Sequence, residues 1–408
     1  QTMIKSEVMF FGTEEDQFFI EIAHTQEYKS GHIVGGDTFL SKSISGGERF
    51  GAILSDGLGS GIRANVLSTL TASMAMNYML HNRPLSDSLS TIMDTLPEDA
   101  GEKISYATCS MFDIDKSGEA HIVEYDNPDY ILLRGSRHFE TRKKSVKIKT
   151  RQGVRSMLES RVMLFKGDRL VFLSDGVTQS GLGSSQHPAG WERGGVISFL
   201  EDFVAKHPEV SAKELSKVVM QKALHNDFFI AKDDITCAVV YLRAPRRVLI
   251  CTGPPFDKGR DKEMAQIFES YPGKKVVCGG TTAQILSREL GKRISGDGRQ
   301  QVKAMLPSTA KMDGAEFVTE GILTLGHLAD LLQNWREGDK IEESPAGDIL
   351  RLLLSNDVID ILMGTRINEA HYDPSLPVEM EIRRNLVRRL KVLLEGGNFM
   401  KRVRIKYI

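Results

Sequence analysis

Two stretches of the chain place the same Ser-Asp-Gly sequence directly after an apolar run: AILSDGLGSG at residues 52–61 and VFLSDGVTQSG at residues 171–181. A short apolar run that ends at a turn signal is typical of a buried strand. A carboxylate at the strand end, followed by glycine, presents oxygen atoms on a rigid scaffold and permits a tight turn. Two strands that end alike raise the question of whether Asp56 and Asp175 meet at one site.

Length and composition narrow the class of protein. A chain of 408 residues predicts two domains. The 53 Lys and Arg residues nearly balance the 54 Asp and Glu residues, so we expect neither nucleic acid nor a membrane surface as the main partner. The four cysteines show no paired spacing, which argues against a zinc site or a disulfide framework. Because no apolar run has the length of a membrane span and residues 1–10 lack the form of a signal peptide, we expect a cytoplasmic protein.

Residues 1–243 show strand patterns with helices grouped between them. The predicted strands lie at 18–28, 32–44, 49–57, 146–148, 169–173 and 234–242, with a three-stranded meander over 107–135. The predicted helices lie at 62–80, 85–96, 195–206 and 212–226, the last with Ser211 as its cap. This order predicts an α+β domain built on antiparallel sheets.

A change of pattern follows the stretch RAPRR at residues 243–247, which has the proline and charge of a linker. From there, apolar strands alternate with helices, with strands at 247–253 and 274–280 and helices at 262–271 and 282–290. This order is typical of a parallel sheet, so residues 246–408 are expected to form a smaller α/β domain. Near its end, residues 379–397 form an amphipathic helix pattern.

Acidic residues stand at the edges of several predicted strands: Asp37 in GGDTF, Asp56, Asp175, and the pair Asp233–Asp234 in KDDITCAVV. A surface turn would explain any one of them. Gathered in one cleft, ionised carboxylates would repel one another unless a cation neutralised them. A set of oxygen ligands without His or Cys favours Mg²⁺ or Mn²⁺, and two such ions would hold a hydroxide for attack on phosphorus.

The order and spacing of GGDTF, ILSDGLGSG, VFLSDGV and DDITCAVVYL resemble the metal-dependent protein phosphatases of the protein phosphatase 2C family, over residues 18–242. The resemblance is to the bacterial branch typified by stage II sporulation protein E. It implies a sandwich of two antiparallel sheets flanked by helices, with two Mn²⁺ or Mg²⁺ ions at one end. It also implies that Asp56 bridges both ions and that the Gly57 carbonyl completes one of them. Asp175 and Asp233 would bind the other ion, and Asp37 would act through bound water.

Some positions leave alternatives or depart from the family pattern. Asp233 is preferred as ligand because the family places it three residues before a threonine, here Thr236, but Asp234 stays an alternative. Leu58 stands where eukaryotic relatives carry a histidine thought to protonate the leaving group. His32 stands where they carry a phosphate-binding arginine, which makes it a candidate phosphate contact, with a structural role as the alternative.

The second domain offers one candidate binding loop, in the stretch VVCGGTTAQIL. Gly279, Gly280, Thr281 and Thr282 lie between a predicted strand and a helix start, where free amides and the helix dipole favour an anion. The stretch lacks both the dinucleotide and the phosphate-loop patterns, and helix capping alone would explain its threonine.

These observations predict a metal-dependent protein serine/threonine phosphatase acting on phosphoserine or phosphothreonine of a regulatory partner protein. The resemblance implies phosphorylated antagonists of anti-sigma factors, or similar regulators, as substrates. The second domain would sense a ligand, recruit the substrate or form a homodimer. The alternative is a catalytically degenerate scaffold of the same fold, whose second domain binds a nucleotide or another anion.

Overall fold

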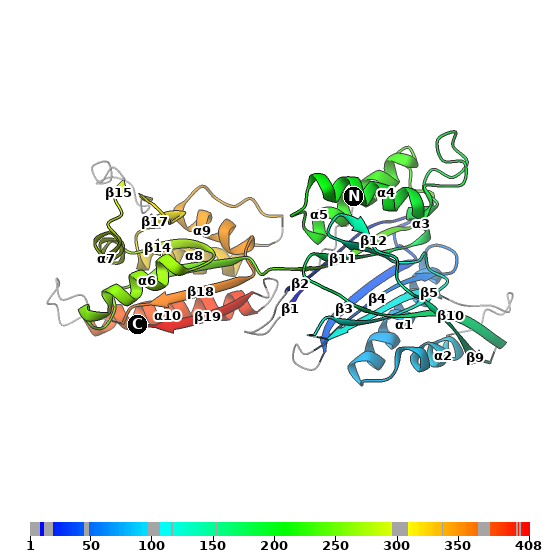
Figure 1. Cartoon of the computed structure of the whole chain (residues 1–408), viewed down its shortest axis with the longest axis horizontal. Helices are drawn as coiled ribbons and strands as arrows, with labels where there is room; N and C mark the ends of the chain where they lie inside the picture. Colours follow the sequence, from blue (N-terminus) through cyan, green and yellow to red (C-terminus); the bar gives the residue numbers. More distant parts are fainter. Residues whose placement is uncertain are drawn as a thin grey trace. The chain divides into compact units, whose positions relative to one another are not determined.

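The computed structural model describes residues 9–11, 19–44, 49–96, 107–115, 117–151, 153–295, 309–336, 338–365, 376–396, 399 and 401–408. The chain divides into two compact units, Gln1–Ala244 and Pro245–Ile408. Figure 1 shows both units with their helices and strands labelled.

Within its described residues, the first unit contains two antiparallel sheets of six strands each. In order across the sheet, the first consists of β1 (Met9–Phe11), β2 (Phe19–Glu27), β12 (Ile235–Arg243), β11 (Asp168–Leu173), β7 (Ile131–Arg134) and β8 (Arg137–His138). The second consists of β3 (Asp37–Ile44), β4 (Arg49–Gly57), β5 (Ala107–Asp115), β6 (Glu119–Tyr125), β10 (Gly153–Met163) and β9 (Lys144–Thr150). The predicted α+β class with antiparallel sheets is confirmed.

The core of this unit lies between the two sheets. Ile22 and Phe172 of the first sheet pack with Leu54 and Phe112 of the second, and all four are buried. Helices α1 (Ile62–Leu80) and α2 (Leu85–Thr95) cover the outer face of the second sheet. Helices α3 (Asp175–Thr178), α4 (Glu192–Lys206) and α5 (Ala212–Asn226) cover the first (Figure 1).

Several elements of this unit differ from the sequence-based expectation. Strands β1 and β8 and helix α3 have no predicted counterpart, and the strand expected from residue 32 begins at Asp37. The helix expected from residue 195 begins at Glu192, because its first turn holds two glycines that weaken the pattern. Strand β10 has no predicted counterpart, since Met157 and Ser160 are its only buried residues and the rest of the strand is half-buried or exposed. A strand with so little apolar alternation carries a weak periodic signal.

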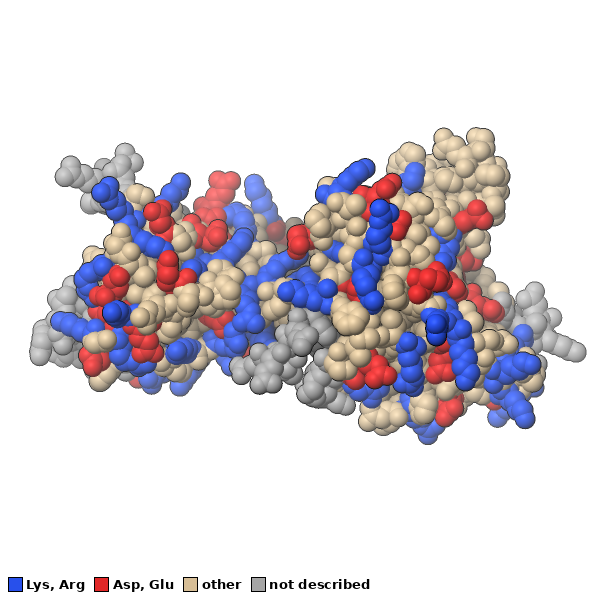
Figure 2. All heavy atoms as spheres, in the orientation of Figure 1, with Lys and Arg blue, Asp and Glu red and all other residues tan. Residues whose placement is uncertain are grey.

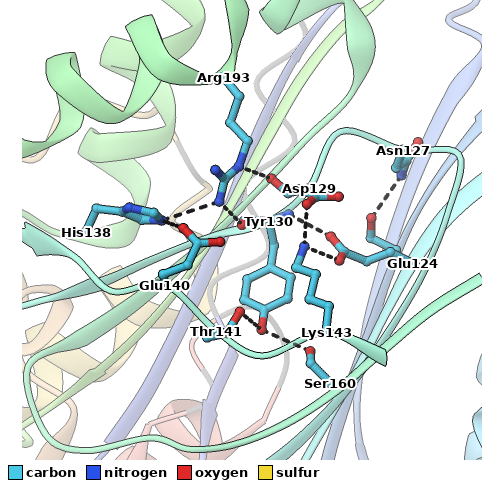
Figure 3. A network of polar contacts seen from close by, with 11 residues as sticks. Glu124, Asn127, Asp129, Tyr130, His138, Glu140, Thr141, Lys143, Ser160 and Arg193 are labelled. Carbon is cyan, nitrogen blue, oxygen red and sulfur yellow. Dashed lines mark hydrogen bonds and ion pairs between the residues drawn. The ribbon is translucent and has the colours of Figure 1, made fainter. Parts of the chain in front are cut away.

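A buried ion pair joins β6 to the chain that leads into β9 (Figure 3). Lys143 Nζ lies 2.5 Å from Glu124 Oε2 and 3.1 Å from Asp129 Oδ2, and it sits 4.4 Å above the centre of the Tyr130 ring. The Tyr130 amide donates to Glu124 Oε1 at 2.6 Å, and Arg193 Nε donates to the Asp129 carbonyl at 3.2 Å. Burial raises the pKa of Glu124 while the Lys143 charge lowers it. Because the members of this cluster contact one another, we assign the ion pair a structural role.

The second unit is built on a parallel sheet of five strands. Across the sheet the order is β17 (Phe317–Thr319), β14 (Lys274–Cys278), β13 (Arg247–Thr252), β18 (Val358–Met363) and β19 (Arg402–Tyr407). The helices are α6 (Asp261–Ser270), α7 (Gly280–Leu290), α8 (Ile322–Asn334), α9 (Pro345–Leu354) and α10 (Leu376–Glu395). One core forms with α8, α9 and α10 and another with α6 and α7, which confirms the smaller α/β domain.

Charged side chains are mixed on the surface. Figure 2 shows Lys and Arg interspersed with Asp and Glu on the visible face of both units. This distribution agrees with the near balance of the two kinds of charge in the sequence. Among the described helices, none combines the length and apolarity that crossing a membrane would require.

Candidate metal and active site

The strand ends of the first unit bring the acidic residues together. Asp37 is the first residue of β3 and lies directly opposite Asp56 near the end of β4. Asp175 begins α3 immediately after β11, and Asp233 precedes β12 by two residues. Because β3 and β4 belong to one sheet and β11 and β12 to the other, both layers of the sandwich contribute carboxylates.

The glycine after each motif aspartate is required by close backbone packing. A Cβ on Gly57 would lie 2.0 Å from the Ala64 carbonyl oxygen in the first turns of α1. A Cβ on Gly176 would lie 2.1 Å from the Asp234 carbonyl oxygen. Neither distance is compatible with a side chain, so the repeated Ser-Asp-Gly sequence lets a neighbouring segment approach each acidic strand end.

Asp37 is the most enclosed member of the site, with 3% of its surface exposed. Its Oδ2 accepts a hydrogen bond of 2.6 Å from Thr236 Oγ1, whereas its buried Oδ1 has no partner among the described residues. Burial raises the pKa of Asp37 to about 8, against the lowering effect of hydrogen bonds from Thr236 and Ser174. The charges of Asp234 and Asp175 raise it further.

Asp56 and Asp233 experience the same crowding. Burial raises the pKa of Asp56 to about 9, and the charge of Asp37, the charge of Asp175 and a hydrogen bond with the Asp175 carboxyl group add to the shift. Burial also raises the pKa of Asp233, with a further contribution from Asp175. Lys29, whose Nζ lies 3.9 Å from Asp233 Oδ1, opposes that shift. The four carboxyl groups therefore lie within electrostatic reach of one another.

Asp234 is held differently from its neighbour. Its Oδ1 accepts a hydrogen bond of 3.0 Å from the Lys29 amide, and its Oδ2 accepts one of 2.7 Å from the Gly36 amide. Both carboxylate oxygens thus fasten the segment that leads into β3, and the residue is buried. Asp233 is half-buried, and its Oδ1 accepts a hydrogen bond of 3.0 Å from the Asp234 amide and lies 3.9 Å from Lys29 Nζ. Which of the two residues binds an ion stays a prediction.

The carboxyl groups fit a hard divalent cation by their chemistry. Among the described residues, no group of three or more His, Cys, Asp or Glu side chains has the arrangement needed to hold a metal ion. The unpartnered Oδ1 of Asp37 and the all-oxygen donor set fit Mg²⁺ or Mn²⁺.

His32 lies beside the loop that carries Asp56. A Cβ on Gly61 would lie 3.1 Å from His32 Nδ1, so the exposed imidazole lies beside Gly61. Leu58 of the same loop is also exposed. The contact of His32 with phosphate stays a prediction.

Exposed apolar side chains lie near each acidic residue along the chain, and we call this set the apolar rim. Its members are Ile33, Leu58, Leu182, Phe228, Phe229 and Ile230. Phe228 and Phe229 are each 73% exposed and adopt left-handed φ angles of 55° and 61°. Their sequence signal is a run of three apolar residues between the end of α5 and Asp233, a pattern that does not indicate metal ligands.

The predicted anion loop, Gly279 to Thr282, belongs to the second unit and begins α7. Gly279 is the N-cap residue, and no side chain caps this helix.

Comparison with known families places the first unit. Residues 46–243 match the family model of stage II sporulation protein E (SpoIIE). This unit is therefore a SpoIIE-type domain of the protein phosphatase 2C family, and the resemblance identified in the sequence is confirmed.

Solved structures of this class are similar to the chain at low sequence identity. The phosphatase domain of Bacillus subtilis SpoIIE with a fragment of its regulatory domain is 19% identical, with a TM-score of 0.45, covering 56% of this chain and 65% of that chain. The RsbU and RsbW domains of a Mycobacterium tuberculosis protein are 17% identical, with a TM-score of 0.42, covering 65% of this chain and 68% of that chain. RsbX in complex with magnesium is 19% identical, with a TM-score of 0.38, covering 57% of this chain and 100% of that chain.

The chain thus spans less than two thirds of the SpoIIE structure named first. A comparison with curated proteins finds no match.

Proposed function

We propose that this chain is a metal-dependent protein phosphatase that hydrolyses phosphoserine or phosphothreonine on a partner protein. One observation carries the proposal: carboxyl groups from both sheets converge around Asp37, whose buried Oδ1 has no partner among the described residues. Such crowding is unfavourable without a cation, and it persists because the strands hold it. The SpoIIE-type domain supports the same class of reaction.

The residues divide the work as follows. Asp56 and Asp175 would hold the ions together with the Gly57 carbonyl and Asp233, and Asp37 would orient water at their edge. Two divalent ions bound here would neutralise the phosphoryl oxygens and activate water for in-line attack. The new bond joins the water oxygen to phosphorus, and the bond from phosphorus to the serine or threonine oxygen breaks. Because Leu58 has no proton to donate, water must protonate the departing oxygen.

The apolar rim supports a protein as the substrate. Phe228, Phe229 and Ile230 expose large apolar side chains a few residues before Asp233, where a small phosphate ester would gain nothing from them. Exposed apolar patches rimmed by polar groups are typical of protein interaction sites. A folded protein that presents a phosphorylated serine beside apolar residues fits this surface.

The test is phosphate release from a phosphoserine peptide and from p-nitrophenyl phosphate, with Mn²⁺, with Mg²⁺ and with EDTA. We expect activity with either metal, its loss in EDTA, and its loss in Asp56→Asn and Asp175→Asn. Asp202→Asn is the matched control, because Asp202 is exposed on α4. Activity that survives both site substitutions would refute the site. A well-folded chain that is inactive with every metal would instead establish the degenerate scaffold.

A further inference from the structure

We propose that the second unit binds a phosphate group between the N-termini of α7 and α8, a function that does not depend on phosphatase activity. Helix α7 follows β14, and α8 follows β17. These two strands are parallel neighbours in the sheet, with Cys278 opposite Thr319 at their ends. Both helices therefore begin at the same edge of the sheet.

The two loops at this edge touch each other. The Gly279 amide donates a hydrogen bond of 2.8 Å to the Thr319 carbonyl, and a Cβ on Gly321 would lie 3.5 Å from the Gly279 Cα. Gly279 and Gly321 are the N-cap residues of α7 and α8, and neither supplies a side-chain cap. Adjacent N-termini point free amides and the positive ends of two helix dipoles at one place, which favours an anion.

Two buried threonine hydroxyl groups lie in the first turns of these helices. Thr282 and Thr324 occupy the third position of α7 and α8, and each is 1% exposed. Neither hydroxyl oxygen has a hydrogen-bond partner among the residues that the structure describes. Thr282 Oγ1 lies 3.4 Å from the point where a Gly279 Cβ would stand, so it is aimed at the N-cap. Buried hydroxyl groups are normally satisfied, so two such exceptions at matching positions require an explanation.

The space around these N-caps is open. A Cβ on Gly280 would meet no atom within 4 Å, and one on Gly279 would meet nothing nearer than 3.4 Å. Sheets of this kind usually bind ligands where the strand order reverses, here between β13 and β18. There the loops after the two strands pack tightly together, because a Cβ on Gly364 would lie 2.1 Å from the Pro254 carbonyl oxygen. The glycine-lined edge of β14 and β17 is the alternative that has room.

Glu320 shows which chemistry this edge accepts. Its Oε2 accepts a hydrogen bond of 2.9 Å from the Leu323 amide, so a carboxylate already rests on the N-terminus of α8. The side chain is exposed and free to turn away when a stronger anion arrives. Amides from two helices and two hydroxyl groups match an oxyanion with several acceptor oxygens. A phosphate group, either free or carried by a nucleotide, has this chemistry.

The experiment is calorimetric titration of the full chain with inorganic phosphate, pyrophosphate and ADP, in EDTA so that a metal centre in the first unit cannot bind them. We expect the dissociation constant to rise about tenfold in Thr282→Val and in Thr324→Val, the effect of one hydrogen bond to a charged group. Glu320→Gln removes a competing carboxylate and should lower the dissociation constant. Tighter binding of ADP than of phosphate identifies a nucleotide site, and equal binding identifies a site for the free oxyanion.

Thermal unfolding separates this role from a structural one. Thr282→Val removes a buried, unpartnered hydroxyl, so without ligand its melting temperature should rise by about 2 °C. Thr71→Val in α1 is the matched control, because Thr71 is equally buried and its hydroxyl also has no partner among the described residues. It should raise the melting temperature and leave phosphate binding unchanged. The proposal is overturned if none of the three probes binds the wild type, or if both site variants bind them as tightly.

Discussion

The acidic site should make the metal-free protein less stable as pH rises. The pKa values of Asp37 and Asp56 lie at about 8 and about 9, above the ordinary value of 3.8. The folded state therefore holds these protons more tightly than the unfolded state. The stability they contribute is complete below about pH 4 and is lost as pH rises through about 8 to 9. Between about pH 4 and about pH 8, each group lowers the free energy of unfolding by about 1.4 kcal/mol for every pH unit of increase.

From about pH 6 to about pH 7.5 the pair would lower the free energy of unfolding by at most about 4 kcal/mol, and by about 2 kcal/mol after allowance for the solvent near Asp56. Asp56→Asn removes one of the two titrating groups and should roughly halve this slope. Added Mn²⁺ should stabilise the wild type and leave the variant unchanged. Urea unfolding across this range measures the slope in EDTA and the metal effect in a parallel series with Mn²⁺ in place of EDTA. A wild-type stability that stays level or increases with pH in EDTA would show that the carboxyl groups do not share one site.

Further predictions concern packing, the buried ion pair and the apolar rim. Gly57→Ala should lower the free energy of unfolding by about 3 kcal/mol because its Cβ has no room, whereas Gly194→Ala on α4, with nothing within 4 Å, should raise it by about 0.5 kcal/mol; urea unfolding compares them. Lys143→Met should lower the free energy of unfolding by about 3–5 kcal/mol at neutral pH by leaving buried Glu124 unpaired. Adding Glu124→Gln should restore much of the loss, and a double variant no more stable than the single one would contradict this. Phe229→Gly relieves a left-handed φ of 61° and should raise stability by about 1 kcal/mol, yet lower kcat/KM for a phosphoprotein about tenfold with p-nitrophenyl phosphate hydrolysis unchanged.

Local signals were sufficient for the helices of the first unit. The predicted bounds 62–80 and 212–226 coincide with α1 and α5, since both stretches lack Gly and Pro. Ser211 caps α5 as expected, with its hydroxyl accepting a hydrogen bond of 3.1 Å from the Glu214 amide. Strand β10 escaped prediction because its pairing with β6 and β9, more than its own side chains, determines its conformation.

The strand-end positions of the acidic residues could be predicted from the sequence, but the contacts that distinguish one acidic residue from another could not. Spacing alone left Asp233 and Asp234 as alternatives. They differ through contacts with a segment about 200 residues earlier, where the Lys29 and Gly36 amides take both oxygens of Asp234. The proposed phosphate site of the second unit also depends on contacts between distant segments. The pairing of β17 with β14 brings Gly321 next to Gly279.

The serine of each Ser-Asp-Gly sequence fixes its strand end to a neighbouring strand and so keeps the carboxyl groups close together. Ser174 Oγ accepts a hydrogen bond of 2.9 Å from the Thr236 amide, which fixes the end of β11 to β12. Ser55 Oγ donates one of 3.0 Å to the Thr108 carbonyl, which fixes the end of β4 to β5. The serine is hydrogen-bonded to one neighbouring strand and the glycine packs against another segment. The backbone of the aspartate between them is therefore held close to the other carboxyl groups. The repulsion among the carboxylates must then be relieved by a proton or by a cation, and the rigid strand ends make the site selective for what neutralises it.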